Sequence, residues 1–177
     1  MTIGTKKLTF EEYLAHDDGT DTPYELIDGE LVAMPPGGRI NSRISFFLAL
    51  ELAQLIPFDL ICHKDTEIEV SGARAKTRLP DLMVLSEELA AALGDRRGTI
   101  TREMPQNEDR NYRYKRSEYA ARGISEHWII NPQASKVTVL TLVSGLYEER
   151  DYAGSQTLQS QFQALQLTVE QVFNAKR

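Results

Sequence analysis

The chain has 177 residues, of which 41% are hydrophobic and 26% charged, and 20 Lys and Arg against 26 Asp and Glu give a net charge of −6. This composition is typical of a globular protein with enough apolar residues for a core, and it excludes a disordered or fibrous chain. Because the protein is acidic overall, any nucleic-acid site must be a local basic patch.

Cysteine, histidine and apolar content exclude further classes. The single Cys62 excludes an internal disulfide, and the first ten residues lack the apolar segment of a signal peptide. No apolar stretch reaches membrane-spanning length. The histidines have no cysteine partners at zinc spacing; they are His16, His63 and His127. Without a signal peptide or a disulfide, the protein is expected to be cytoplasmic. We find no repeat and no linker, so we expect one domain over residues 1–177.

The N-terminal part predicts a helix and a hairpin. Thr9 and Glu12 have the spacing of a capping box, which predicts a short helix through Leu14. Residues 24–34 form two apolar runs separated by Asp-Gly, the strongest short-range signal for a β-hairpin. Glu25 and Glu30 flank this turn. Such carboxylates are more often solvated strand positions than ligands, but we keep both as candidate metal ligands.

The middle of the chain predicts a helix and then an antiparallel pair. Apolar spacing over residues 40–55 predicts an amphipathic helix that Pro57 stops. Residues 60–70 alternate, which predicts a strand with Asp65, Glu67 and Glu69 on a solvated face. We expect the turn 71–76 to return the chain as the partner strand, and Ser86 to cap a helix over residues 87–93 that Gly94 closes.

Asp81 stands at the start of that partner strand and is the principal candidate for chemistry. Pro80 is tolerated at a strand's first residues, so the strand proper is predicted to be 82–85. A carboxylate is costly to bury unpaired, so Asp81 should bind a cation, accept hydrogen bonds or face a cleft. The alternative is an aspartate that only caps a turn.

Residues 96–122 are basic, with eight Lys and Arg against four Asp and Glu, a net of +4 on an acidic chain. The second half, 109–122, predicts a helix with Lys115 on one stripe between two tyrosines. Lys115 is therefore turned toward the protein, although it could equally lay its stem on the core and keep its ammonium in water. The phosphate-binding candidates are Arg110, Arg113 and Arg116. A structural reading, in which the basic run only neutralises acidic surface, stays open.

The C-terminal part predicts a β-meander. Residues 126–131, 136–143 and 146–152 are rich in β-forming residues and are joined by turn sequences, with Trp128 in the core. Thr168 and Gln171 have capping-box spacing and predict a short last helix through Phe173.

The chain lacks a phosphate-binding glycine loop, a nucleophile elbow and a zinc-protease helix. Carboxylates and a positioned lysine remain. Mg²⁺ commonly takes one or two protein carboxylates and fills its other positions with water and phosphate oxygens. A nearby lysine can stabilise the charge that develops as metal-activated water attacks phosphate.

Four segments resemble, in order, the successive motifs of the Uma-type endonuclease family, which is abundant in cyanobacteria and placed in the PD-(D/E)XK superfamily. They are residues 24–30, 78–81, 112–124 and 126–132. The resemblance implies an α/β, restriction-endonuclease-like fold with a mixed central sheet flanked by helices. It also implies that Asp81 is a metal ligand, that Lys115 is the catalytic lysine on a helix, and that an acidic residue of the hairpin lies near the site.

One family motif is missing. Family members carry a core strand between the counterparts of Pro105 and Asn107, roughly Val-Val-Glu-Val, whose glutamate is the second acidic ligand. Here Pro105 is followed directly by Gln106, so either this strand has been lost or the sequence lacks a segment. Glu103 and Glu108 are nearby substitutes, but neither lies in a comparable strand.

Taken together, these features predict a Mg²⁺-dependent endonuclease, with Mn²⁺ as a substitute, that hydrolyses phosphodiester bonds in nucleic acid, DNA ahead of RNA. The catalytic set is Asp81, Lys115 and Glu30, and the metal ligands are Asp81 and Glu25. The alternative is a catalytically degenerate protein of the same fold that binds nucleic acid or forms a homodimer. No motif separates DNA from RNA or reveals a sequence preference.

Overall fold

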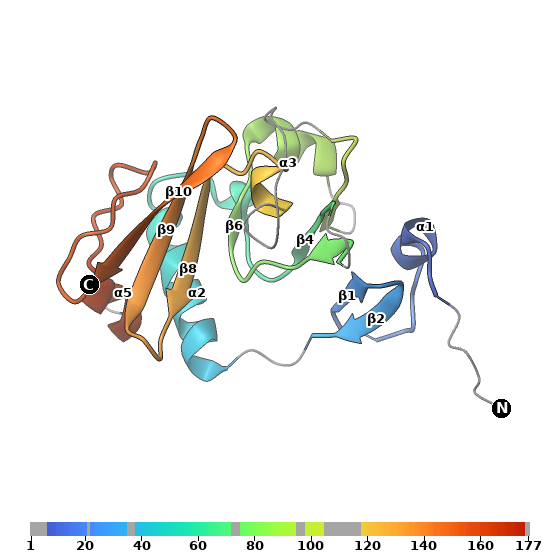
Figure 1. Ribbon diagram of the computed structural model, residues 1–177, viewed down its shortest axis with the longest axis horizontal. Helices are drawn as coiled ribbons and strands as arrows, with labels where there is room; N and C mark the ends of the chain where they lie inside the picture. Colours follow the sequence, from blue (N-terminus) through green and yellow to red (C-terminus); the bar gives the residue numbers. More distant parts are fainter. Residues whose placement is uncertain are drawn as a thin grey trace.

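The structure, a computed structural model, describes residues 7–20, 22–34, 38–71, 75–94, 98–104 and 118–175. Within these ranges short helices and strands alternate, and the strands form four small sheets. One sheet contains both parallel and antiparallel pairs, and helices flank the strands (Figure 1). The predicted α/β class is confirmed, with the strands divided among several sheets in the described part of the chain.

Helix α1 (Phe10–Leu14) and the hairpin of β1 (Tyr24–Ile27) and β2 (Glu30–Ala33) lie at one end of the molecule (Figure 1). Thr9 caps α1, since its hydroxyl accepts from the Glu12 amide at 3.1 Å while the Glu12 carboxylate accepts from the Thr9 amide at 2.9 Å. At the turn, Asp28 and Gly29 have φ angles of 51° and 81°. Two positive φ values are typical of a tight hairpin turn, so both predictions are confirmed.

Strands β4 (Thr66–Glu69), β5 (Thr77–Arg78) and β7 (Gly98–Ile100) form a mixed sheet. Its central strand β4 pairs antiparallel with β5 and parallel with β7. Helix α3 (Glu87–Leu93) begins at Ser86, whose hydroxyl accepts from the Leu89 amide at 3.2 Å, and ends at Gly94, as predicted. The core beside them contains buried apolar residues of the sheet, of α3 and of neighbouring segments: Ile68, Val70, Ala75, Leu85, Leu93, Ile100 and Tyr119.

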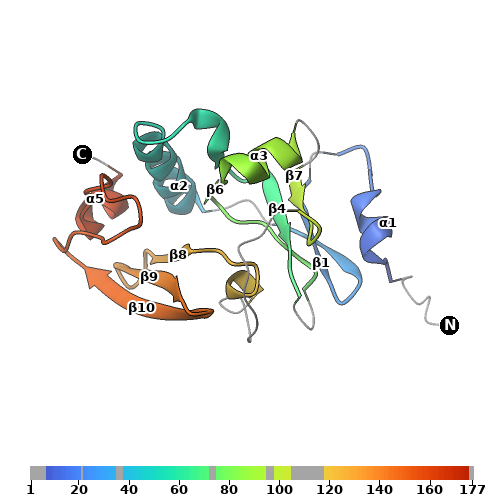
Figure 2. The same ribbon diagram turned by 90° about the horizontal axis from the view of Figure 1, so that it is seen from above.

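The second core lies under the C-terminal meander. Strands β8 (Glu126–Asn131), β9 (Lys136–Val143) and β10 (Leu146–Ala153) are antiparallel in the order β10-β9-β8, as predicted. Helices α2 (Arg39–Leu52) and α5 (Val169–Asn174) cover one face of them (Figure 2). Helix α2 ends at Leu52, before the predicted residue 55. Buried residues of both helices meet alternate residues of β9, including Ile44, Leu48, Val137, Val139, Val169 and Val172.

A short strand pair connects these two cores. After the 3₁₀ helix η1 (Phe58–Leu60), β3 (Ile61–Cys62) pairs antiparallel with β6 (Met83–Val84). Ile61, Leu82 and Val84 pack against the same core as Trp128 of β8, which is partly buried. Cys62 and Met83 of the same pair pack against the first core, so Asp81, two residues before β6, lies beside strands that contact both cores.

Two predictions for residues 60–70 were wrong. The expected continuous strand is divided into β3 and β4, because Lys64 adopts a left-handed backbone with φ 62°. The solvated acidic face is also incorrect, since Glu67 is only 7% exposed. The expected antiparallel return is divided too: β5 pairs with β4, whereas β6 pairs with β3.

The predicted helix over residues 109–122 falls mostly outside the described residues. Residues 118–120 are helical, and Gly123 has φ 67°, which fits its predicted role at a helix end. Within the described ranges, no helix has both the length and the apolar character needed to cross a membrane.

Candidate active site

Asp81 lies in a bend that follows Pro80, and its side chain is 64% exposed. Its carboxylate oxygen Oδ1 is 3.2 Å from the Nζ atom of Lys64. Among the described residues, no backbone amide donates to this carboxylate, so a turn-capping role has no support there. Asp81 is a largely exposed carboxylate, and its cationic partner among the described residues is Lys64.

Lys64 reaches Asp81 from the neighbouring strand. The register of β3 and β6 pairs Cys62 with Met83, and its continuation places residue 64 opposite residue 81. The Lys64 ammonium also donates to the Ser42 hydroxyl of α2 at 3.1 Å. Strand pairing and the bond to α2 together hold this cation at the carboxylate.

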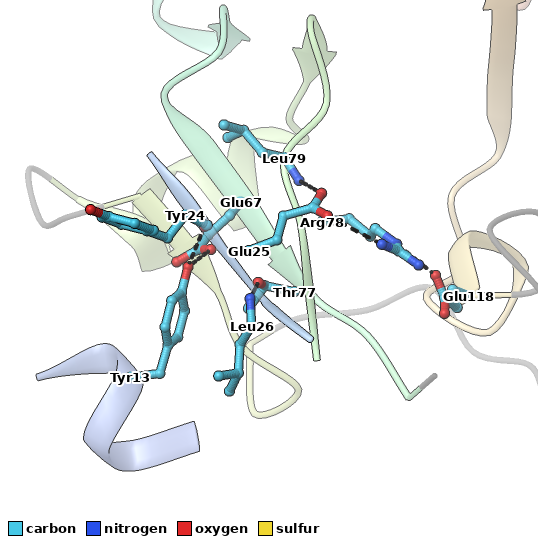
Figure 3. A network of polar contacts seen from close by, with 9 residues as sticks. All are labelled: Tyr13, Tyr24, Glu25, Leu26, Glu67, Thr77, Arg78, Leu79 and Glu118. Atoms are coloured by element: carbon cyan, nitrogen blue, oxygen red, sulfur yellow. Dashed lines mark hydrogen bonds and ion pairs between the residues drawn. The ribbon is translucent and has the colours of Figure 1, made fainter. Parts of the chain in front are cut away.

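Glu25 is buried in an ion-pair network (Figure 3). Its carboxylate accepts from Arg78 Nη1 at 3.2 Å and from the Leu79 amide at 3.3 Å. Arg78 Nε donates to the buried Glu118 at 2.9 Å. Burial lowers the pKa of the Arg78 guanidinium, but the hydrogen bond and charge of Glu118, followed by those of Glu25, outweigh burial and raise that pKa overall. Glu25 therefore already has a cationic partner.

A second buried carboxylate, Glu67, lies close to this network in Figure 3. The Tyr13 hydroxyl donates to Glu67 and lies 2.8 Å from the Tyr24 carbonyl oxygen. The Thr99 hydroxyl donates to the other Glu67 oxygen at 2.7 Å. These contacts supply the partners that a buried carboxylate requires, and they attach α1 to the mixed sheet.

A cleft of about 280 Å³ opens above Glu67 and is lined by residues of the N-terminal segment and of the β3–β4 connection. Lys64 and Leu79 belong to its wall, so the cleft lies beside Asp81. The lining also includes the carboxylates Asp17 and Asp18. Hydrogen bonds from Thr20 and then from Tyr24 lower the pKa of Asp18 to about 2, so this carboxylate is ionised at neutral pH.

The structure describes only some of the remaining predicted residues. Glu30 is exposed at the start of β2. Lys115, together with Arg110, Arg113 and Arg116, lies outside the described residues, as does Glu108; Glu103 is described and exposed.

Two other arginines of the basic segment make contacts within the protein. Arg102 pairs with Glu69 at 3.1 Å, and the buried Arg122 donates to the Thr101 carbonyl oxygen at 3.0 Å. Burial lowers the pKa of Arg122, and the charge of Glu69 opposes this. These two arginines attach the basic segment to the mixed sheet.

A family model provides the identification. The model of the Uma2 family, described as a putative restriction endonuclease, matches residues 10–170. The chain belongs to the Uma2 family. The resemblance found in the sequence motifs is thereby confirmed.

A solved structure shows the same fold as this Uma2 chain. It is the crystal structure of a putative nuclease belonging to DUF820 from Anabaena variabilis, with a TM-score of 0.64 and 16% sequence identity, covering 95% of this chain and 98% of that chain. None of the curated proteins matches the chain. Family and fold together support a nuclease-like protein.

Restriction-endonuclease-like families generally use divalent metals, and the described residues of this Uma2 chain allow a test of fit. Among them, no group of three His, Cys, Asp or Glu is placed to hold an ion. Asp81 offers open oxygens, whereas Glu25 and Glu67 are already bonded. One open carboxylate fits the way in which Mg²⁺ binds with few protein ligands and many waters, but it predicts weak binding.

Two site residues were missed by sequence reasoning. Lys64 lies in the polar run His63-Lys64-Asp65, which interrupts the apolar alternation and could have been interpreted as a turn. Glu67 carries no such signal, because alternation alone placed it in water. Its burial depends on Tyr13 and Thr99, which come from other parts of the chain.

Proposed function

We propose that this Uma2-family chain is a Mg²⁺-dependent nuclease that hydrolyses phosphodiester bonds in nucleic acid, with Mn²⁺ as an alternative ion. Membership of a family described as restriction endonucleases and a fold shared with a nuclease-like protein support the reaction class. The observation that carries the proposal is the Asp81 carboxylate, which stays open to solvent beside a cation at the start of a core strand.

Each candidate residue has a role in this proposal. Asp81 would hold the ion, which when bound lowers the pKa of its water and neutralises phosphate charge. Lys115 would stabilise the charge that develops on the phosphate. Glu30 is exposed and would hold or move a proton, whereas Glu25 would have to release the Leu79 amide or Arg78 to become a ligand. The candidates for phosphate contacts are Arg110, Arg113 and Arg116.

A second candidate function is a catalytically silent protein that binds nucleic acid or acts as a dimeric interaction module. The hydrogen bonds of Glu25 and Glu67 favour the silent protein, since both buried carboxylates already have donors among the described residues. A binding module requires no metal. Metal dependence therefore separates these two functions.

Thermal unfolding with and without Mg²⁺ tests the metal role of Asp81. We expect Mg²⁺ to raise the Tm of the wild type, and Asp81→Asn to lose that rise because the amide is nearly isosteric but is a poorer ligand. Asp151→Asn is the matched control, since Asp151 also pairs with a lysine, Lys136, at 2.9 Å. Equal metal-induced shifts in the wild type and in Asp81→Asn would reject the ligand role.

Nucleic-acid binding in EDTA and in Mg²⁺ completes the comparison, with duplex DNA and single-stranded RNA as probes. Metal-dependent cleavage by the chain, or by a variant with a Val-Val-Glu-Val strand inserted after Pro105, supports the nuclease. Binding without cleavage by either protein supports the module.

Three wider expectations are proposals as well. They are that the chain is one domain, that it works in the cytoplasm, and that it forms a homodimer. Light scattering would detect the homodimer.

A further inference from the structure

Lys64 is held at the candidate site by contacts on two sides. Its ammonium contacts Asp81 at 3.2 Å and Ser42 at 3.1 Å, and its side chain is 28% exposed. An ammonium group has three N–H donors, so these two contacts leave one donor for a further acceptor. The Lys64 ammonium, which lines the cleft, can therefore donate a further hydrogen bond to a ligand there.

The backbone at Lys64 is fixed by the strands on either side. Its φ of 62° is a left-handed conformation that lysine rarely adopts. The preceding strand β3 is paired with β6, and the following strand β4 is paired with β5 and β7. Unusual backbone conformations persist where the surroundings enforce them, often at functional sites. The ammonium is consequently presented by a rigid turn.

The charges around the cleft give Lys64 a distinct role. Among the described residues that line the cleft, Lys64 is the only lysine or arginine, and the acidic ones are Asp17, Asp18, Asp65 and Glu67. The four carboxylates repel a polyanion that enters this cleft, whereas the Lys64 ammonium attracts it. Because the ammonium is in contact with Asp81, a phosphate bound to Lys64 would lie next to whatever Asp81 holds.

We propose that Lys64 is a phosphate-binding residue of this site, which contacts a backbone phosphate of nucleic acid directly beside Asp81. The inference rests on the proposed function, because it requires that the chain binds nucleic acid. Lys64 belongs to the β3–β4 turn and not to the basic segment that carries Lys115, so it would be an additional phosphate contact.

The test is binding to a labelled DNA duplex in EDTA over a series of salt concentrations, for wild type, Lys64→Met, Lys64→Arg and Lys136→Met. Losing one phosphate contact reduces the slope of log K against log salt by about 0.9 for duplex DNA. We expect that reduction, with weaker binding at low salt, for Lys64→Met. Lys64→Arg should keep the wild-type slope, because arginine also carries a positive charge that binds phosphate.

Lys136→Met is the matched control, because Lys136 also pairs with an aspartate but lies at the start of β9 in the meander. It should behave as the wild type. Thermal melts check that every variant is folded. A folded Lys64→Met with wild-type affinity and slope would overturn the inference and leave the proposed function standing. Absence of binding by the wild type itself, to duplex DNA and to RNA, would overturn the proposed function and this inference with it.

Discussion

Arg78 and Glu118 are joined by a 2.9 Å hydrogen bond although 40 residues separate them in the sequence. The bond attaches strand β5, three residues before Asp81, to the residues that follow Lys115 closely in the chain. Since Arg78 also binds Glu25, one partly buried guanidinium connects all three segments that the proposed site requires. We infer that Arg78 positions the site rather than taking part in chemistry.

Replacing Arg78 by Met should destabilise the protein strongly. Removing one partner of a buried ion pair costs about 3–5 kcal/mol, because the other charge stays buried without compensation. Here two carboxylates, Glu25 and Glu118, would lose their cation. Urea unfolding of Arg78→Met and of Lys136→Met, whose exposed pair is worth about 1 kcal/mol or less, measures the difference. A loss below about 1 kcal/mol in Arg78→Met would show that the network contributes little.

Tyr119 should make stability depend on pH in the alkaline range. Burial, followed by smaller effects of nearby charges, raises the pKa of Tyr119 to about 12 from its ordinary 10.0. Above pH 10 the unfolded chain loses this proton while the folded protein keeps it, so stability falls as pH rises. Between pH 9 and pH 11 the loss from this group should be about 1 kcal/mol.

Tyr119→Phe checks this expectation, because phenylalanine has no proton to lose. Unfolding in urea at pH 9 and pH 11 should show a decline about 1 kcal/mol smaller in the variant than in the wild type. Tyr147, whose pKa burial also raises, remains in both proteins and cancels in the difference. Equal declines in the two proteins would mean that Tyr119 titrates normally.

The basic segment should contribute phosphate contacts of its own. If Arg110 and Arg113 both contact phosphates, changing both to Ala should reduce the salt slope of duplex binding by about 2. Arg150→Ala is the control, since Arg150 lies on β10 and bonds Gln159. A slope that stays at the wild-type value in the double variant would remove these residues from the interface.

Local signals predicted local structure well. The Thr9 and Thr168 capping boxes, the Asp28-Gly29 turn and the Ser86 cap all involve partners within a few residues, and each is present as predicted. Such contacts are encoded by spacing alone, because the partners are fixed by the geometry of one helical turn or one hairpin.

Long-range pairing could not be predicted in the same way. Lys64 meets Asp81 only because β3 pairs with β6, and Glu67 is buried only because Tyr13 and Thr99 reach it from distant segments. Alternation in one strand predicts which side chains share a face, but it does not predict which face becomes covered. The family motifs identified Asp81 and Lys115 as candidates. They did not indicate that Lys64 pairs with Asp81, because that contact depends on how β3 and β6 pair.

The central claim is that this chain has a nuclease site from which one acidic metal ligand is missing. Cleavage of DNA by the chain with and without an added acidic strand tests this claim most directly. We predict that the 177-residue chain cleaves little or no DNA at millimolar Mg²⁺, since no group of three His, Cys, Asp or Glu among the described residues is placed to hold an ion. A variant with a Val-Val-Glu-Val strand inserted after Pro105 should gain Mg²⁺-dependent cleavage. Lys115→Ala in that variant should reduce the rate by about a hundredfold or more. Efficient Mg²⁺-dependent cleavage by the chain itself would contradict the claim that its metal site is incomplete, and would show that its own carboxylates complete the site.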